Sequence, residues 1–321
     1  MNLFNEIGGY PELDLNRGDH YHQDAILLNT GRTCFEYILK AQKIAHVYMP
    51  KYTCDVMLEP LKKLNIKYTF YSINENLEIS EDINPDNDEL LVYTNYFGIK
   101  DRYCDELINR YGSRTVIDAS QAFYYKAPTG GNIFYSPRKF FGLPDGGILY
   151  TDRKIDYELE RDVSYNRFSH LVKRIDLGAE QAYEDFKNND KMLENIELKK
   201  MSLLTERLLE NIDYQKVKAQ RLANFKYLHS QFGEINKLKL SIDGIKCPMN
   251  YPLYLEKNGV REEFIRNKIF VPTYWPNTFD WCEKGDIEYT LAKNILPLPI
   301  DQRYSEQDLS KIIEVFDEYN N

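Results

Sequence analysis

The sequence lacks an excess of positive charge, a pattern of paired cysteines and a long apolar run. Its formal net charge is −9, which argues against a nucleic-acid partner because phosphate backbones are bound by basic faces. The five cysteines form an odd set without a Cys-x-x-Cys pair, so they indicate neither a disulfide framework nor a zinc site. No apolar stretch approaches the length needed to cross a bilayer, and the first residues have no signal-peptide pattern. We therefore expect a soluble, cytoplasmic protein without a metal ion or a membrane partner.

Histidine is scarce as well, with five residues in the chain. His20 and His22 could present one face of a strand to a metal, but their segment is polar and offers no third ligand. We expect both side chains at the surface.

Short stretches with strand character alternate with helical stretches through the first half of the chain. Strands are expected to begin near residues 25, 46, 66, 89 and 115, with helices at 55–64 and 101–111. This alternation is typical of right-handed βαβ units and a largely parallel sheet. We expect an α/β fold with a three-layer α/β/α large domain and a mostly parallel sheet at 1–212. A smaller C-terminal α+β domain is expected at 213–321.

Helical spacing dominates the chain after residue 152. Helices are expected at 157–168, 179–186, 195–212 and 220–232, and the stripe of apolar residues at 195–212 is typical of a core or subunit interface. The C-terminal part is expected to contain strands at 247–255, 269–276 and 295–300 and helices at 260–267 and 308–319.

One lysine and one aspartate together indicate a possible cofactor chemistry. Lys139 lies in an aromatic, glycine-rich turn, where partial desolvation favours a neutral amine that attacks aldehydes. Asp118 ends an apolar run, and the carboxyl ends of strands are where open α/β sheets present groups to ligands. Pyridoxal phosphate uses both groups, because a lysine forms its Schiff base and an acid keeps its pyridine nitrogen protonated. The alternatives are a solvated loop lysine and an aspartate that caps a helix.

A glycine turn between the strand near residue 25 and the next helix is a candidate phosphate site. It comprises Thr30, Gly31, Arg32 and Thr33. The first turn of a helix offers free backbone N–H groups and the positive end of the helix dipole, which together bind phosphate.

Two motifs resemble the DegT/DnrJ/EryC1/StrS family of sugar aminotransferases. Residues 118–122, Asp-Ala-Ser-Gln-Ala, are similar to the family's Asp-Ala-Ala-Gln-Ala element. Lys139 with Gly146 and Gly147 resembles the family's lysine turn, Ser-Phe-His-x-x-Lys, which runs on to Gly-Glu-Gly-Gly. The motifs stand in the family's order, and the glycines follow the lysine by seven and eight positions. The resemblance implies a pyridoxal-phosphate-dependent transferase of fold type I.

The resemblance also implies contacts to the cofactor. The family places the phosphate on the turn that corresponds to residues 30–33, and Gln121 matches the glutamine that contacts the ring beside Asp118. The chain has Cys54 where the family usually has an aromatic residue that stacks on the pyridine ring, so Tyr52 or Tyr96 would have to supply the stacking.

A second departure concerns the phosphate. Phe134 replaces the family's phosphate-binding serine, and Ser136 could substitute if the turn is reshaped. The family's asparagine loop, donated by the second subunit, is not found before the long helix, although residues 165–167 (Tyr-Asn-Arg) could act similarly. Lys173 with Arg174 is a candidate for a nucleotide diphosphate or a solvated helix face. Tyr274 and Trp275 either line the substrate entrance or pack on the sheet.

The resemblance implies an aminotransferase that delivers an amino group to a nucleotide-linked keto sugar, for cell-surface polysaccharide or secondary-metabolite biosynthesis. An amino donor such as glutamate and a homodimer are implied with it. Another pyridoxal phosphate reaction on a sugar nucleotide, a dehydration or an epimerisation, is an alternative. A non-catalytic member that binds a sugar nucleotide is a third possibility. The joint presence of Lys139, Asp118 and Gln121 argues against that third possibility.

Overall fold

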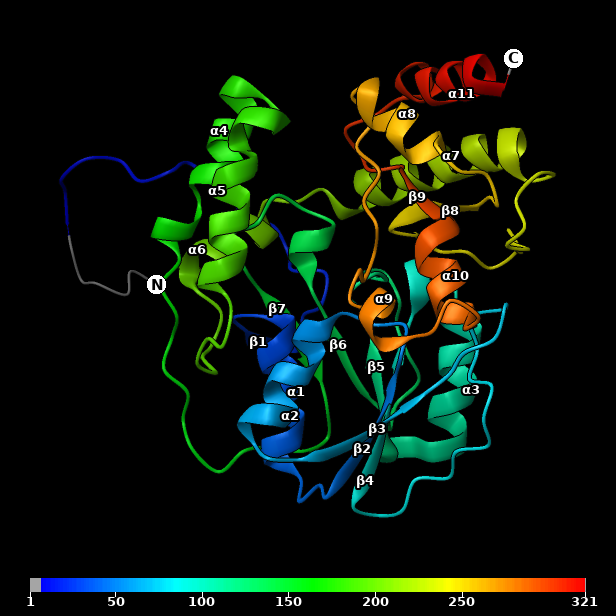
Figure 1. Cartoon of the computed structure of the whole chain (residues 1–321). Coiled ribbons are helices and arrows are strands. Elements are labelled where there is room, and N and C mark those ends of the chain that lie inside the picture. The colour runs from blue at the N-terminus through cyan, green and yellow to red at the C-terminus, as the bar shows by residue number, and fades with distance from the viewer. Residues whose placement is uncertain (1–6, 321) are drawn as a thin grey trace.

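A computed structural model describes residues 7–320, and its main sheet has seven strands. Strand β7 is antiparallel to both of its neighbours, and every other pair in this sheet is parallel. In their order across the sheet, the strands are β1 (Ile26–Leu28), β7 (Gly147–Tyr150), β6 (Asn132–Tyr135), β5 (Thr115–Asp118), β4 (Glu89–Thr94), β2 (His46–Pro50) and β3 (Lys67–Tyr71) (Figure 1).

Alternate side chains of the strands belong to two cores, one on each face of the sheet. On β4, Leu90 and Val92 pack with helix α1 (Gly31–Ala41) and with Leu61 of helix α2 (Glu59–Lys63). Leu91 and Tyr93 belong to the opposite core, together with helix α3 (Asp101–Tyr111). A strand buried on both faces needs apolar side chains in both directions, which explains the continuous apolar runs in the strand sequences. The structure confirms the predicted three-layer α/β/α arrangement with a mostly parallel sheet (Figure 1).

Short 3-10 turns join several of these elements. They are η1 (Asp55–Leu58), η2 (Tyr96–Gly98), η3 (Gly112–Arg114), η4 (Pro137–Lys139) and η5 (Tyr165–Arg167). The predicted helix at 55–64 is thus divided between η1 and α2, whereas the predicted helix at 101–111 is confirmed by α3.

The middle segment differs from the prediction in two places. Residues 157–168 form no α-helix and contain only η5. Helix α6 begins at Leu203 rather than at 195, and ends at Glu210. The predicted helix at 179–186 is part of a longer one. The remaining helices of this segment are α4 (Ser169–Leu177), α5 (Ala179–Met192) and α7 (Tyr214–Phe232).

The chain before α6 is extended because it lies along strand β1. The N–H of Met201 donates to the carbonyl of Leu27 (3.1 Å), and the N–H of Asn29 donates to the carbonyl of Lys199 (3.0 Å). Ser202 then caps the helix, since its Oγ accepts the N–H of Thr205. Backbone pairing with a sheet edge has outweighed the helical spacing of the side chains.

A second, antiparallel sheet is formed by β8 (Asn250–Tyr254) and β9 (Ile295–Pro299). Its core includes Phe225 of α7, Phe264 of α8 (Val260–Arg266) and Phe316 of α11 (Glu306–Asn320). Two more helices, α9 (Thr278–Trp281) and α10 (Ile287–Asn294), precede β9. The small α+β unit has its own core, and the boundary at 212/213 stays a prediction.

The strand predicted at 269–276 is irregular in the structure. Pro272 and Pro276 have no N–H to donate to a ladder, and Trp275 adopts a left-handed backbone conformation with φ of 53°. Its ring turns inward and contacts the ring of Tyr52, with centroids 4.5 Å apart.

His22 is buried rather than at the surface, which corrects the prediction for this residue. Its ring lies 4.9 Å from the ring of Phe123 and 4.4 Å from that of Tyr135. His20 is half-buried, and its Nδ1 accepts the N–H of His22 (2.9 Å). An aromatic cluster that assembles from distant parts of the chain encloses His22, so its polar neighbours in sequence were misleading.

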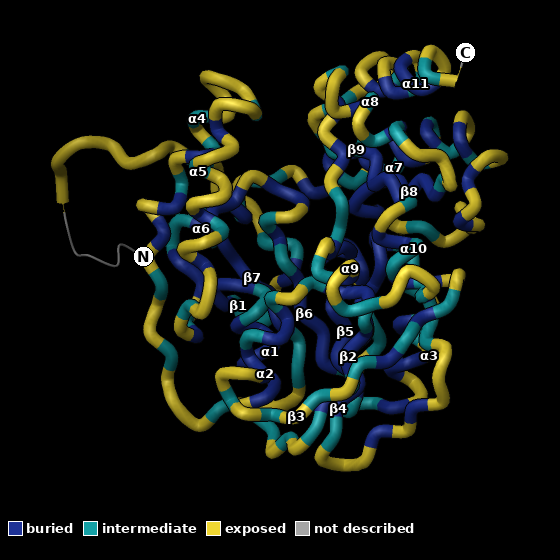
Figure 2. The backbone as a smooth tube through the Cα atoms, viewed as in Figure 1, coloured by how far each residue is buried: buried dark blue, intermediate teal, exposed yellow. Residues whose placement is uncertain are grey.

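No helix within residues 7–320 is long and apolar enough to span a membrane. The prediction about a signal peptide concerns residues 1–6, which lie outside the described residues. Buried backbone follows the sheet and the core of the small unit, whereas α4 and α5 are largely exposed (Figure 2).

Candidate functional site

Asp118 and the lysine turn leave the same edge of the sheet. Strands β5 and β6 are parallel neighbours, with Asp118 opposite Phe134. The chain leaves β6 at Tyr135 and forms η4, which ends at Lys139. Because both strands end at this edge, the structure brings the two predicted catalytic residues to one end of the sheet.

Lys139 is exposed in this chain, so the desolvation expected from its aromatic neighbours in sequence is not found. Its side chain makes no ion pair and no hydrogen bond with any residue of 7–320. Phe140 and Phe141 are buried in the core instead of covering the amine. The lysine is therefore available to a ligand, but a single chain does not enclose it.

Phe140 fixes the turn immediately after Lys139. Its carbonyl accepts hydrogen bonds from Nη2 of Arg221 (3.2 Å) and from Nε2 of Gln302 (3.0 Å). The guanidinium carbon of Arg221 also lies 4.5 Å from the centre of the Phe140 ring. Arg221 is 2% exposed. It therefore couples α7 to the lysine turn, a role that no motif in the sequence indicated.

Close packing explains why Gly146 and Gly147 are both glycine. Gly146 has a φ of 115°, which favours glycine. A Cβ on Gly147 would lie 2.1 Å from the carbonyl oxygen of Thr30 and 2.6 Å from Sγ of Cys34. The two glycines let the start of β7 approach the start of α1. They place the lysine turn beside the predicted phosphate turn.

Asp118 is held at the end of β5 with one oxygen engaged. The carboxylate is 7% exposed, and its Oδ1 accepts the N–H of Ser120 (2.9 Å). Gln121 is buried, and its Oε1 accepts the N–H of Phe97 (2.6 Å) in η2. Gly98, the residue after Phe97, has a φ of 75°. A Cβ at this position would clash with the carbonyl oxygen of Gln121. Gln121 thus orders the loop next to Asp118.

The predicted phosphate turn is the start of α1. Thr30 and Thr33 satisfy each other in a capping box, and Oγ1 of Thr33 also donates to Asn29 (2.7 Å). Among residues 7–320, the N–H groups of Gly31 and Arg32 have no hydrogen-bond acceptor. The turn therefore offers two backbone donors to a ligand, while its threonine hydroxyls are engaged.

Ser136 lies beside this turn. A Cβ on Gly31 would lie 3.6 Å from Cβ of Ser136 and 3.7 Å from the ring of Phe134. Phe134 is buried and stacks on Phe35, with centroids 6.3 Å apart. Arg32 points elsewhere, since its Nη1 pairs with Glu59 at 2.9 Å. The phenylalanine fills the core, and Ser136 is left beside the turn.

Tyr52 and Tyr96 pack on each other. Both are buried, their ring centroids are 5.5 Å apart, and the Tyr96 hydroxyl donates to the carbonyl of Tyr52 (3.0 Å). Cys54 is half-buried. Burial raises the pKa of the Cys54 thiol, and the nearby Lys139 ammonium counters part of that rise. Of these three predicted ring contacts, only Cys54 keeps exposed surface, so stacking by Tyr52 or Tyr96 stays a prediction.

Buried charges anchor the far end of the lysine turn. Asp145 is fully buried and accepts hydrogen bonds from Nη2 of Arg167 (2.6 Å) and Oγ1 of Thr205 (2.5 Å). The same Nη2 of Arg167 pairs with Asp162 at 2.7 Å. Arg167 therefore has an internal structural role, while the idea that residues 165–167 act like the family's asparagine loop stays a prediction. Sequence reasoning missed this network because its members are far apart in the chain.

Most of the other predicted ligand contacts of the middle and C-terminal segments are engaged within the chain. Lys173 pairs with Asp185 at 2.6 Å, and Arg174 is exposed. The hydroxyl of Tyr274 accepts a hydrogen bond from Asn250 (2.9 Å). Trp275 packs against Tyr52, which agrees with packing rather than an entrance for Trp275.

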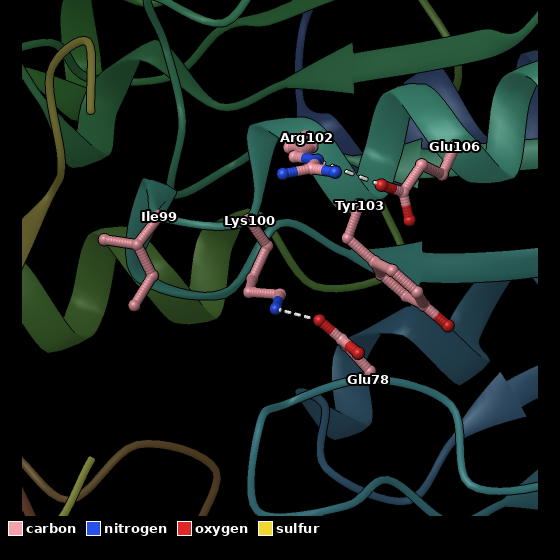
Figure 3. A pocket seen from close by; sticks show the side chains of 6 residues that line it. All are labelled: Glu78, Ile99, Lys100, Arg102, Tyr103 and Glu106. Atoms are coloured by element: carbon pink, nitrogen blue, oxygen red, sulfur yellow. Dashed lines mark hydrogen bonds and ion pairs between the residues drawn. The ribbon is translucent and has the colours of Figure 1, made fainter. Parts of the chain in front are cut away.

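A surface pocket of about 220 Å³ lies beside α3 and contains none of the predicted site residues (Figure 3). Among its lining residues, Lys100 pairs with Glu78 (2.5 Å), and Arg102 pairs with Glu106 one turn further along α3 (3.2 Å). Because its four charges cancel in pairs, the pocket has no unmatched charge with which to attract an ionic ligand. We therefore locate the candidate site at the carboxyl edge of the sheet.

Solved structures share the fold of the chain. It is similar to a DegT/DnrJ/EryC1/StrS aminotransferase from Brucella abortus, with a TM-score of 0.62 and 14% identity over 92% of this chain and 85% of the other. For NtdA from Bacillus subtilis, solved with bound cofactor PMP, the TM-score is 0.58 at 16% identity, over 91% and 73%. For DesI, solved in the presence of its TDP-sugar product, the TM-score is 0.60 at 12% identity, over 91% and 79%.

No family model and no curated protein matches the sequence. The identities to the three solved structures are far below the level at which function follows from likeness. The comparison therefore establishes the fold of these aminotransferases for this chain, whereas the function follows from the residues of the site.

Proposed function

We propose that the protein is a pyridoxal-phosphate-dependent aminotransferase that acts on a nucleotide-linked keto sugar. The observation that carries the proposal is the placement of Asp118 and the Lys139 turn at the carboxyl edge of neighbouring parallel strands. The shared fold with sugar aminotransferases supports the reaction class and the sugar substrate.

The residues at this edge fit the cofactor. Gly31 leaves space beside Ser136, and the N–H groups of Gly31 and Arg32 can bind a phosphate at the positive end of α1. Asp118 keeps Oδ2 free to hold a proton on the pyridine nitrogen. Lys139 has no competing partner among the described residues.

When bound, pyridoxal phosphate supplies an aldehyde that condenses with amines and a ring that accepts electrons from the substrate carbon. Lys139 would hold the cofactor through its Nζ and would then carry a proton between substrate and cofactor carbons. Asp118 would keep the pyridine nitrogen charged, and Ser136 would add a hydroxyl to the phosphate site. Cys54, half-buried near Lys139, would line the site where the family has an aromatic ring.

Three finer points belong to the same proposal. Glutamate is the proposed amino donor, a cytoplasmic location stays a prediction of the sequence analysis, and a homodimer is proposed as the working assembly. The homodimer is supported by Lys139, which a single chain leaves exposed. It is also supported by the exposed apolar side chains of α4 and α5.

The test uses purified chain with added pyridoxal phosphate. We expect an absorption band at the edge of the visible range, and after borohydride reduction we expect the mass of the cofactor on the peptide that contains Lys139. Lys139→Ala should lose both signals. Lys126→Ala is the matched control, since Lys126 is an exposed loop lysine with no assigned role.

Addition of glutamate should then bleach the band of the wild type. A band that persists with glutamate, and is lost in Lys139→Ala, would instead favour another pyridoxal phosphate reaction such as a dehydration or an epimerisation. Absence of any band or peptide adduct at saturating cofactor would overturn the enzyme proposal and favour a sugar-nucleotide binder on this fold.

A further inference from the structure

Three potential metal ligands lie together in the segment between α9 and α10. Cys282 directly follows α9, Asp286 is the N-cap of α10, and Glu288 lies in the first turn of α10. One ligand atom from each of these residues lies within 4.8 Å of the other two. Cys282 and Asp286 are half-buried, so an ion could reach the cluster from solvent.

Glu288 is the unusual member, because its carboxylate is buried without a cation. It is 1% exposed, and Oε1 accepts the N–H of Ile73 (2.8 Å). Oε2 has no hydrogen-bond partner, and no lysine, arginine or histidine of 7–320 pairs with this side chain. Buried carboxylates are otherwise paired or bound to metal ions. The buried oxygen without a partner points to a cation as its ligand.

Lys51 is an alternative source of positive charge for the cluster. Its Nζ lies 3.8 Å from Oδ2 of Asp286, and both side chains are partly exposed. The lysine therefore pairs with the outer carboxylate of the cluster and not with Glu288. It balances one of two acids and leaves the buried one without a partner.

We propose that Cys282, Asp286 and Glu288 bind one divalent transition-metal ion of the zinc class. A thiolate with two carboxylates suits Zn²⁺, whereas Mg²⁺ and Ca²⁺ favour oxygen ligands alone. Ligand atoms on tetrahedral zinc are roughly 3.5 Å apart, so the side chains would close by about 1 Å around the ion. Binding displaces the thiol proton, and a water molecule completes the coordination.

The ion would brace one wall of the candidate site. Close to the cluster, Nδ2 of Asn277 donates to the carbonyl of Thr53 (2.9 Å), and the ring of Trp281 lies 4.8 Å from that of Phe70. Thr53 connects Tyr52 to Cys54. None of the three proposed ligands is assigned to the cofactor, so the metal site has a structural role that is independent of the proposed reaction.

No pattern in the sequence indicates this site. The spacing Cys-x-x-x-Asp-x-Glu contains one cysteine and no histidine, and it does not match a known zinc pattern. The feature that distinguishes it is the burial of Glu288, which depends on the packing of α10 against the end of β3.

The test is a calorimetric titration of tag-free, chelator-treated chain with Zn²⁺, repeated with Mg²⁺. We expect one Zn²⁺ per chain, little binding of Mg²⁺, and a higher melting temperature with Zn²⁺. Cys282→Ser should weaken Zn²⁺ at least tenfold. Glu283→Gln is the matched control, because Glu283 is an exposed acid of the same segment and lies outside the cluster.

Titration with Cd²⁺ identifies the ligand, since a cadmium thiolate absorbs in the ultraviolet. The band should appear in the wild type and disappear in Cys282→Ser. Cys282 is half-buried, so serine should be tolerated, and circular dichroism of the metal-free variant checks this. Glu288→Gln tests a second proposed ligand. If that variant fails to fold, Asp286→Asn replaces it in the same titration.

Two results would overturn the proposal. One is the absence of stoichiometric Zn²⁺ binding to the wild type, and the other is a cadmium thiolate band that survives in Cys282→Ser. Lys51→Met distinguishes the proposed ion from Lys51 as the source of positive charge. The variant should bind Zn²⁺ more tightly, because the lysine no longer competes for Asp286. If Lys51→Met instead destabilises the chain and Zn²⁺ does not bind, Lys51 is the counter-ion of the cluster.

Discussion

The buried ring of His22 makes the stability of the chain depend on pH. Its Nε2 faces the carbonyl of Phe123 (2.9 Å), and its Nδ1 faces the hydroxyl of Tyr150 (3.1 Å). A neutral ring satisfies both, because Nε2–H donates to the carbonyl and Nδ1 accepts from the phenol. Burial lowers the pKa of His22 from 6.5 to about 3. The folded chain therefore resists a proton that the unfolded chain accepts.

We expect this histidine to contribute stability above pH 6.5, its unfolded value, and to lose it as the pH falls toward about 3. Between about pH 7 and about pH 5, the loss should be ~2 kcal/mol. Urea unfolding at several pH values measures it in the wild type and in His22→Gln. The variant should show a shallower pH dependence. Parallel curves for the two proteins would contradict the assignment.

The role of a single residue could be predicted from the sequence only where the pattern that indicates it is local. Asp118, Lys139 and the double glycine have a fixed spacing along the chain, and the structure brings them to one edge of the sheet. His22 and Glu288 are buried by segments far away in sequence, so no local pattern predicted their burial. Exposure of Lys139 was also unpredictable, because Phe140 and Phe141 turn into the core.

Among the elements, η5 and α6 are joined to the lysine turn by the buried Asp145. Arg167 of η5 and Thr205 of α6 are its hydrogen-bond partners. Burial raises the pKa of Asp145, and Thr205 and Arg167 counter that rise. These contacts oppose the effect of burial on the carboxyl group and fix the turn between Lys139 and β7.

Arg167→Met should cost about 3–5 kcal/mol of unfolding free energy, because it leaves a buried carboxylate without its cation. Arg138→Met is the comparison, since Arg138 pairs with the partly exposed Asp190 and should cost about 0–1 kcal/mol. Urea unfolding measures both. Asp145→Asn in the Arg167→Met background should recover part of the loss. Equal costs for the two arginine variants would show that the buried network is not a major source of stability.

The elements differ in how well periodicity predicted them. Helix α3 has the predicted bounds because one face of it packs on the sheet and no other partner competes. Residues 195–202 have helical spacing, but pairing with β1 holds them extended. At 269–276, two prolines and the inward ring of Trp275 replace the predicted strand. Periodicity fails where a sheet edge or a distant aromatic ring provides a better partner.

Across the whole molecule, the small unit and the main sheet meet at the lysine turn. Arg221 donates to the carbonyl of Met249 (2.9 Å), just before β8, and to the carbonyl of Phe140. Movement of the small unit would therefore change the position of the residue after Lys139. The sequence predicted both units, but a single buried arginine that joins them has no sequence pattern.

The α4–α5 hairpin projects from the molecule, and most of its residues are exposed or half-buried (Figure 1, Figure 2). Its exposed apolar side chains are Val172, Ile175, Leu177, Tyr183, Phe186 and Met192. A group of this size on one hairpin is unusual for a surface in contact with water. Helix α5 also touches the lysine turn, because Asp190 pairs with Arg138 (2.6 Å) and Asn189 donates to the carbonyl of Pro144 (2.8 Å).

A second copy on this hairpin would therefore lie beside Lys139 and could supply the cover that one chain lacks. We expect Ile175→Glu to weaken dimerisation at least about tenfold, as measured by sedimentation equilibrium, and to weaken binding of pyridoxal phosphate with it. Ile175 is 83% exposed, so the fold of the monomer should be unaffected. Ile265→Glu, at an exposed isoleucine of α8, is the control and should change neither property. A wild type that stays monomeric at micromolar concentration, yet binds the cofactor tightly, would show that one chain completes its own site.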